Sequence, residues 1–242
     1  VLSLAVSGTN LFAGTGGNGV FLSTNNGTSW SGVSSGLTGS AVSGTYVYSL
    51  AVSGTNLFAG TGNGVFLSTN NGTSWSEVSS GLMNKNIKSV VVSGTNLFAG
   101  NLNDGVFLST DNGATWSQVN SNLTNTDVLS LAVSGSNLFA GTRRGVFVSS
   151  DNGRSWKEVN YGLTIRDIYS LVISGTKLFA GTDGGVFLST DNGMSWTTVS
   201  PGMTSRSVKS LAVSGTNLRA RASSSGVFLS NNPGLSCIAT GL

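Results

Sequence analysis

The sequence predicts an all-β fold, a six-bladed β-propeller built from four-stranded antiparallel blades. Three observations support this prediction. A segment typified by Gly185–Trp196, GVFLSTDNGMSW, occurs in six copies along the 242 residues. Successive copies are about 40 residues apart, which is the length of one propeller blade. Apolar residues within each copy form short runs typical of strands, and no segment has the period of a helix.

The repeat boundaries follow from the first apolar strand of each copy. These strands start at Val1, Val47, Ile87, Val128, Ile168 and Val208, so the steps are 46, 40, 41, 40 and 40 residues. A regular internal period of this kind favours one repeat domain over two unrelated ones. We therefore predict a single propeller domain over residues 1–242, with blades at 1–46, 47–86, 87–127, 128–167, 168–207 and 208–242.

The end of each repeat predicts a tight hairpin. In the fifth copy it reads Ser189-x-Asp191-x-Gly193-x-Ser195-Trp196. The Asp191 side chain can accept hydrogen bonds from the backbone of the turn, and Gly193 can adopt a left-handed conformation. The aromatic ring of Trp196 can cover the hairpin.

The pattern S-x-D-x-G-x-S/T-W resembles the Asp-box, or BNR repeat, of sialidases, xyloglucanases, sortilin-type receptors and photosystem II assembly factors. Five copies match it, and the sixth, Ser230–Cys237, is degenerate. The resemblance implies a β-propeller in which the box braces the third and fourth strands of each blade. It implies no single activity, since the family includes enzymes, receptors and assembly factors. The box residues that it implies are Asn25, Asn70, Asp111, Asp151 and Asp191, together with Trp30, Trp75, Trp116, Trp156 and Trp196.

Composition argues against several functional classes. Charged residues make up 9% of the chain, histidine is absent, and the net charge is +3. The few basic residues are scattered, so we expect no nucleic-acid partner. One cysteine, Cys237, excludes an intrachain disulfide and a thiolate metal cluster. We expect no cofactor, no metal, no membrane span and a monomer. The abundance of Gly, Ser, Thr and Asn favours a secreted or cell-surface bacterial protein.

Two sets of residues at repeated positions are expected to be structural. Phenylalanines in the second and third strands are expected to pack between neighbouring sheets. The third residue of every first strand is serine, which we attribute to small size.

The sixth repeat departs from the pattern, because Arg219 replaces the second-strand phenylalanine and Arg221 follows it. We predict a distorted last blade with Arg219 turned to solvent or paired, since an unpaired buried arginine would be costly.

The loops at the two ends of the blades differ in variability. Connections between first and second strands are nearly identical, whereas those between second and third strands and between blades diverge. Ligand sites lie on variable loops over a rigid framework, so we expect any site on the divergent end. Candidates on its outer loops are Asp104, Asp127, Arg143, Arg144, Asp167 and Asp183.

A second candidate site lies at the start of the first strands. If these positions face the central channel, side chains from several blades meet at its mouth. The alternative is that they only fill the channel. The candidate residues are Tyr48, Lys88, Tyr169 and Lys209, with Arg166 and Arg206 above them.

The expected function is non-catalytic binding of a glycan or a protein. A sialidase needs an arginine triad and a tyrosine paired with a glutamate, but Glu77 and Glu158 are the only glutamates and follow box tryptophans. A glycoside hydrolase needs two nearby carboxylates, for which Asp127 and Asp167 are the candidates. A hydrolase or sialidase-like enzyme and a structural spacer of a larger secreted or surface protein remain the alternatives.

Overall fold

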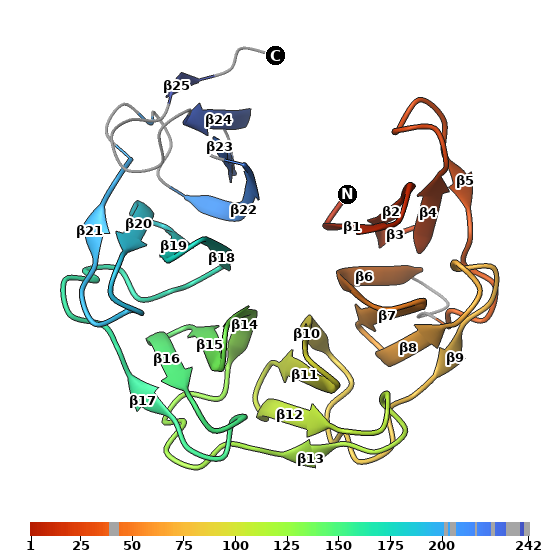
Figure 1. The fold of residues 1–242 in the computed structure, drawn as a ribbon, viewed down its shortest axis with the longest axis horizontal. Coiled ribbons are helices and arrows are strands. Elements are labelled where there is room, and N and C mark those ends of the chain that lie inside the picture. The colour runs from red at the N-terminus through yellow and green to blue at the C-terminus, as the bar shows by residue number, and fades with distance from the viewer. Residues whose placement is uncertain are drawn as a thin grey trace. The chain divides into compact units, whose positions relative to one another are not determined.

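The fold is a β-propeller of six four-stranded antiparallel blades (Figure 1). The computed structural model of the chain describes residues 1–38, 44–200, 203, 207–215, 217–223, 226–230 and 238–239. Within these residues all regular structure is β-strand, and none is helical. The chain divides into two compact units, Val1–Val119 and Asn120–Leu242. Each unit contains three blades, and the single domain over residues 1–242 stays a prediction.

The first unit contains the first three blades, whose strands pair in sequence order apart from the two-residue strand β3. The first blade consists of β1 (Ser3–Ser7), β2 (Asn10–Gly14), β4 (Val20–Ser23) and β5 (Ser31–Gly32). The second consists of β6 (Thr45–Ser53), β7 (Asn56–Thr61), β8 (Gly64–Ser68) and β9 (Ser76–Glu77). The third consists of β10 (Ile87–Ser93), β11 (Asn96–Asn101), β12 (Gly105–Ser109) and β13 (Ser117–Gln118).

The second unit repeats this arrangement in three more blades. The fourth blade consists of β14 (Val128–Ser134), β15 (Asn137–Thr142), β16 (Gly145–Ser149) and β17 (Lys157–Glu158). The fifth consists of β18 (Ser170–Ser174), β19 (Lys177–Thr182), β20 (Gly185–Ser189) and β21 (Thr197–Thr198). The sixth consists of β22 (Val208–Ser214), β23 (Asn217–Ala222), β24 (Gly226–Ser230) and β25 (Ile238–Ala239).

The repeat hairpin between the third and fourth strands is held by its own side chains. In the third blade, Ser109 donates to Asp111 at 2.7 Å and accepts the Gly113 N–H at 2.8 Å. Asp111 also accepts the N–H and the hydroxyl of Thr115, at 2.9 and 2.6 Å. Both Asn112 and Gly113 have positive φ, 57° and 88°, a conformation that asparagine and glycine adopt most readily. The hairpin is therefore defined locally by the motif.

Asparagine replaces the aspartate of this hairpin in the first two blades without changing its geometry. Asn25 Oδ1 accepts the Ser29 N–H at 2.9 Å, as Asp111 accepts that of Thr115. Its amide Nδ2 donates to the Ser29 hydroxyl at 2.9 Å, where the aspartate would accept. Asn70 makes the same contacts with Ser74. The hairpin thus needs a planar oxygen-bearing side chain more than it needs a charge.

Phenylalanine and glycine on the second strand receive the next blade. Phe58 is fully buried and packs in one cluster with Ile87, Val90 and Phe107 of the third blade. A Cβ added to Gly60 would lie 2.9 Å from Cγ2 of Ile87, closer than real contacts allow. In the second unit, Phe179 packs with Val208 and Leu211 in the same way. The phenylalanines are therefore core residues, and the glycines allow the neighbouring sheet to approach.

The serine in the first strand bonds to the next blade, a role that the sequence analysis missed. Ser49 Oγ accepts the N–H of Val90 at 3.0 Å, across 41 residues of sequence. In the second unit, Ser130 accepts from Leu171 at 2.9 Å and Ser170 accepts from Leu211 at 3.1 Å. Small size alone is therefore an incomplete explanation for serine at this position.

The hairpin tryptophan also binds the preceding blade. The Trp116 indole N–H donates to the Val78 carbonyl at 2.7 Å, and that of Trp196 donates to the Val159 carbonyl at 2.8 Å. Because the hairpin places each indole, the local motif orients a contact between sheets. The repeated motif therefore specifies both the turn and the attachment of one blade to the one before it.

The sixth blade is regular in its described strands, so the predicted distortion is wrong there. Arg219 pairs with Leu229, and Ala220 with Phe228, as Phe179 pairs with Leu188 in the fifth blade. Arg219 and Arg221 are exposed, as predicted for Arg219. The register of a strand depends on the backbone and the turns. An exposed arginine therefore changes the side chains on the face of the sheet without shifting the strand. Pro233 and Cys237 lie outside the described residues.

Replacing Asp111, Asp151 and Asp191 with asparagine is expected to reduce the loss of stability in acid. Hydrogen bonds from Thr115 hold the pKa of Asp111 at about 2, and hydrogen bonds from Ser155 hold the pKa of Asp151 at about 2. In each pair the hydroxyl lowers the pKa most, followed by the backbone N–H. The same contacts lower the pKa of Asp191. A carboxylate whose pKa is lower in the folded than in the unfolded protein stabilises the fold at pH values above its unfolded pKa. This stabilisation is lost as the pH falls through the folded pKa.

The measurement is the urea midpoint of unfolding at pH 7, pH 4 and pH 2.5 for both proteins. The variant should change little at pH 7, because Asn25 and Asn70 already form the same hairpin. Its midpoint should fall less between pH 4 and pH 2.5 than that of the parent. An equally steep fall in both proteins would contradict the stabilising role of these carboxylates.

Ser170→Ala is expected to destabilise the second unit by about 1–2 kcal/mol, because the Leu211 N–H loses its acceptor. Ser3→Ala is the matched control. Ser3 occupies the equivalent position, but its Oγ is buried without a hydrogen-bond partner among the described residues. Urea unfolding should therefore show a lower midpoint for the first variant and no loss for the second. Equal effects would mean that the interblade hydrogen bond contributes nothing.

Candidate ligand-binding site

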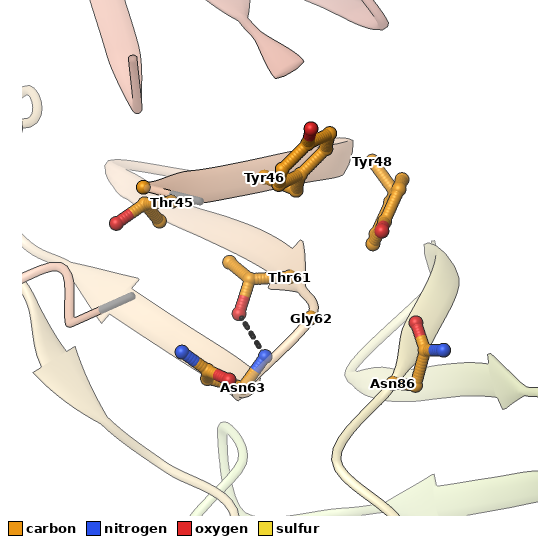
Figure 2. A pocket seen from close by; sticks show the side chains of 8 residues that line it. Thr45, Tyr46, Tyr48, Thr61, Gly62, Asn63 and Asn86 are labelled. Atoms are coloured by element: carbon orange, nitrogen blue, oxygen red, sulfur yellow. Dashed lines mark hydrogen bonds between the residues drawn. The ribbon is translucent and has the colours of Figure 1, made fainter. Parts of the chain in front are cut away.

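A pocket of about 350 Å³ opens in the first unit, beside the start of β6. Figure 2 shows side chains that line it, from β6, from the turn between β7 and β8, and from the segment before β10. Its lining residues are Gly44, Thr45, Tyr46, Tyr48, Thr61, Gly62, Asn63 and Asn86. We call this cavity the tyrosine pocket.

The long first strand of the second blade creates the tyrosine pocket. β6 runs over nine residues, Thr45–Ser53, whereas β18 runs over five. The added part pairs with β3 (Gly16–Gly17) of the preceding repeat. Side chains two residues apart on a strand share one face, so Tyr46 and Tyr48 lie together. Their ring centroids are 5.9 Å apart with an interplanar angle of 28°.

One tyrosine of the pair is accessible and the other is partly enclosed. Tyr46 is 39% exposed. Tyr48 is half-buried, and the Lys88 Nζ lies 3.5 Å from its ring centroid. Burial, with a smaller effect of the neighbouring Tyr46, raises the pKa of Tyr48. Burial also lowers the pKa of Lys88. Tyr46 is therefore the more accessible aromatic ring of the pocket, with Tyr48 stacked against it and Lys88 over the Tyr48 ring.

Amide side chains supply the polar part of the pocket. The Asn63 N–H donates to the Thr61 hydroxyl at 3.0 Å, and the Asn63 amide donates to the Thr38 carbonyl at 3.0 Å. These bonds hold the turn between β7 and β8. The side-chain oxygen of Asn86 is buried and accepts no hydrogen bond from the described residues. A buried polar atom without a partner is costly, but this oxygen is inaccessible, so a ligand donor would reach it only if the Asn86 side chain turned.

The second unit brings together another pair of predicted residues, Tyr169 and Lys209. The Lys209 Nζ lies 3.2 Å from the Tyr169 ring centroid and 3.0 Å from Asp183 Oδ1. Asp183 also accepts the Tyr169 hydroxyl at 2.7 Å and the Ser207 hydroxyl at 2.6 Å. These hydroxyl hydrogen bonds, Ser207 first, hold the pKa of Asp183 at about 2. The polar groups of Tyr169, Ser207 and Lys209 are therefore already bonded to Asp183, whereas the Asn86 oxygen of the tyrosine pocket accepts no hydrogen bond from the described residues.

Two of the other candidate cations are paired with carboxylates. Arg166 bonds to Glu158 at 2.8 Å, and Arg143 lies 3.7 Å from Asp127. Lys85, a further cation of the divergent loops, pairs with Glu77. These pairs neutralise cations of the divergent loops, so the loops are less suited to attracting anions than their basic residues alone would indicate.

The remaining candidates do not gather into one site. Arg144 is exposed, with its N–H bonded to Thr142 at 3.0 Å. The Asp104 backbone bonds to Asn101 and Gln118, and Asp167 is half-buried. Arg206 lies outside the described residues. No cluster of three or more possible metal ligands occurs in the described part of the chain.

Sequence reasoning found Tyr48 and Lys88 but missed Tyr46, Asn63 and Asn86. The missed signal was the loop before the second blade, about five residues longer than its counterparts, which ends in Tyr46. A tyrosine two residues before another on a predicted strand indicates a shared face. The asparagines gave no such signal, because asparagine is common in turns throughout the repeats.

Comparisons with known proteins agree on the fold. The family described as DUF6242 beta propeller domain matches residues 45–171, which is 127 of the 242 residues. No curated protein matches the chain. No helix capable of crossing a bilayer is found in the residues that the structure describes.

Solved structures with this fold come from different functional classes. The extracellular domain of a one component system from B. thetaiotaomicron superposes with a TM-score of 0.76 at 17% identity, covering 95% of this chain and 32% of that one. YCF48 bound to D1 peptide gives a TM-score of 0.73 at 15% identity, covering 99% of this chain and 81% of that one. The GH74 enzyme of Niastella koreensis gives a TM-score of 0.72 at 17% identity, covering 100% of this chain and 37% of that one. The chain thus spans about a third of the first of these proteins, and the likeness shows the fold alone.

Asp183→Asn is expected to lower the pKa of Tyr169. The hydrogen bond from its hydroxyl to Asp183, followed by burial, raises the pKa of Tyr169 above its ordinary value of 10.0. Without the carboxylate the phenolate is less disfavoured, so ionisation should begin at lower pH. Absorbance at 295 nm during alkaline titration measures this, with Tyr169→Phe identifying the contribution of that ring. An unchanged Tyr169 titration in Asp183→Asn would show that burial alone sets the shift.

Proposed function

The chain belongs to the DUF6242 β-propeller family, and we propose that it is a non-catalytic binding module. The observation that carries this proposal is the tyrosine pocket. It combines an accessible aromatic ring, an amide oxygen that accepts no hydrogen bond from the described residues, and a lysine whose Nζ lies over the second ring. Concave sites with an aromatic surface and a few placed polar groups are typical of small-ligand recognition.

The ligand class that fits best is a glycan. The C–H face of a sugar ring can stack on the Tyr46 ring, which is accessible and supported by Tyr48. Sugar hydroxyls are donors and acceptors, and the Asn63 and Asn86 amides that line the pocket carry both kinds of group; the Asn86 oxygen would pair with a hydroxyl only after its side chain turned. The lining residues are tyrosines, amides, threonines and glycines. This chemistry suits stacking and hydrogen bonding, and it supplies no acid and base for glycoside hydrolysis.

A short peptide is the second candidate ligand. YCF48, which shares the fold with a TM-score of 0.73, has been solved bound to D1 peptide. Tyrosines and asparagines are also adaptable contacts for peptides. A hydrolase based on Asp127 and Asp167 is less favoured, because Asp127 lies in an ion pair with Arg143. A spacer role is the outcome expected if neither ligand class binds.

We further propose that the repeat hairpins are Asp-boxes and that the protein is secreted or surface-located. The hairpin hydrogen bonds of Ser109, Asp111 and Thr115 give the motif the bracing role that Asp-boxes have. The extracellular domain from B. thetaiotaomicron that shares the fold supports the location. The low content of charged residues, 9%, agrees with a surface that does not depend on charge for recognition.

Glycan-array binding of the 242-residue chain, compared with Tyr46→Ala and Asn86→Ala, is the test of this function. Each variant is expected to lose at least ten-fold in affinity, because one removes the stacking surface and the other a hydrogen-bond acceptor. Tyr161→Ala is the matched control, since Tyr161 is an 81% exposed tyrosine outside the tyrosine pocket. Its affinity should be unchanged.

Three other results would contradict the proposal in different ways. Glycan binding that survives Tyr46→Ala would place the site elsewhere on the chain. Binding of a peptide library at the same residues, with no glycan bound, would replace the ligand class. Absence of binding to either library would leave the spacer role.

A further inference from the structure

Asp183 of the second unit shows how this repeat holds a carboxylate. Its Oδ2 accepts the Tyr169 hydroxyl at 2.7 Å, and its Oδ1 accepts the Ser207 hydroxyl at 2.6 Å. Lys209 Nζ lies 3.0 Å from the same Oδ1 and 3.2 Å from the centroid of the Tyr169 ring. Donors from two neighbouring blades thus surround one carboxylate. We call this arrangement the internal carboxylate site.

The first unit contains the same kinds of donor in its second and third blades. The tyrosine and the lysine each directly precede the repeated serine of a first strand, and a polar residue stands two positions before the lysine. The geometry agrees as well, since Lys88 Nζ lies 3.5 Å from the centroid of the Tyr48 ring. The equivalent pairs are Tyr48 and Tyr169, Lys88 and Lys209, and Asn86 and Ser207.

The carboxylate itself is missing from the first unit, because Gly62 stands where Asp183 stands. Both residues follow a threonine that ends the second strand, and both begin a two-residue turn to the third strand. Apart from the adjacent residues, a Cβ added to Gly62 would have Tyr48 Cε2 as its nearest neighbour, at 3.9 Å, which is an ordinary contact. The position of the carboxylate is therefore open and lies beside Tyr48.

The donors of the first unit lack the partner that their equivalents have. Burial lowers the pKa of Lys88, and no carboxylate of the described residues offsets this effect. Burial lowers the pKa of Lys209 too, but hydrogen bonds with Tyr169 and Asp183 outweigh it and leave that pKa above its ordinary value. Burial is also the main cause of the raised pKa of Tyr48, to which no hydrogen bond contributes. An anion beside Lys88 would favour the charged ammonium.

The open position belongs to the tyrosine pocket. Tyr48, Gly62 and Asn86 all line this cavity of about 350 Å³ (Figure 2). Tyr48 also stacks with Tyr46, at 5.9 Å between ring centroids. One tyrosine ring thus lies next to both the accessible aromatic surface and the open position, so a single ligand can use both.

We propose that the ligand of the tyrosine pocket presents a carboxylate, which binds beside Gly62 in the place that Asp183 occupies in the internal carboxylate site. Its donors are the Tyr48 hydroxyl and the Lys88 ammonium, with the Asn86 amide nitrogen as the counterpart of the Ser207 hydroxyl.

The carrier of this carboxylate is a sugar acid, an assignment that rests on the proposed function. In a uronic acid the carboxylate is attached directly to the sugar ring. A single sugar residue therefore offers an apolar face to Tyr46 and an anion to Lys88. A neutral sugar would leave Lys88 without a counterion.

The first test measures the preference for the acid by isothermal titration calorimetry. Oligosaccharides of glucuronic, galacturonic and mannuronic acid are each compared with their methyl esters, which keep the sugar and remove the charge. The 242-residue chain should bind one of the acids about ten-fold more tightly than its ester. Lys88→Met should abolish this preference. Lys85→Met is the matched control, since Lys85 pairs with Glu77, and the preference should remain.

The second test needs no ligand. Gly62→Asp restores the carboxylate of the internal carboxylate site, so it should raise the pKa of Lys88 and abolish the preference for acids. Gly62→Asn is the matched control, because it fills the same space without a charge and should leave the pKa of Lys88 unchanged. NMR titration of ¹³C-methylated lysines measures the pKa, and Lys88→Met identifies the Lys88 signal.

Four results would overturn the inference. Equal binding of acids and esters, lost in Tyr46→Ala, would do so and leave the proposed function intact. Equal pKa values of Lys88 in the two Gly62 variants would show that a carboxylate at this position does not act on Lys88. Binding of a peptide carboxyl terminus that depends on Lys88, with no glycan bound, would exclude the sugar acid as the carrier. Absence of binding to acids, esters and peptides would contradict both proposals.

Discussion

The structure depends on one repeated joint, in which a phenylalanine and a glycine of one blade receive the first strand and the tryptophan of the next. A four-stranded sheet with two phenylalanines cannot bury both faces by itself, so the blades are stable only in contact with neighbours. Phe58 and Phe179 are almost completely buried through such contacts. Glycine at the positions of Gly60 and Gly181 is needed because valine and isoleucine side chains of the next blade occupy the space of a Cβ.

The joint also explains why polar residues are repeated as strictly as apolar ones. Ser170 accepts a hydrogen bond from a backbone N–H of the following blade, and Trp196 donates one to the preceding blade. Such bonds are directional, so they align sheets that apolar packing alone would allow to slide. Because the same contacts are made by equivalent residues in each unit, repeat positions can be interpreted by comparing blades with one another.

The candidate site arises where the repeat pattern is interrupted. The longer connection before the second blade extends β6 and adds Tyr46 to the face that already holds Tyr48. In the second unit the equivalent Tyr169 lacks such a neighbour in the described strands, and its hydroxyl bonds to Asp183 instead. The rigid joints thus supply the framework, and a local change in loop length makes one position open and aromatic (Figure 2).

The sequence by itself determined the blades, their strand order and the repeat hairpins. These features depend on short-range chemistry, such as the Asp111 and Gly113 pattern, and on a period of about 40 residues. Tertiary structure decided the partners of residues from different blades. The Ser49 bond to Val90, the Lys88 contact with Tyr48 and the pairing of Arg166 with Glu158 depend on how strands and loops come together in space.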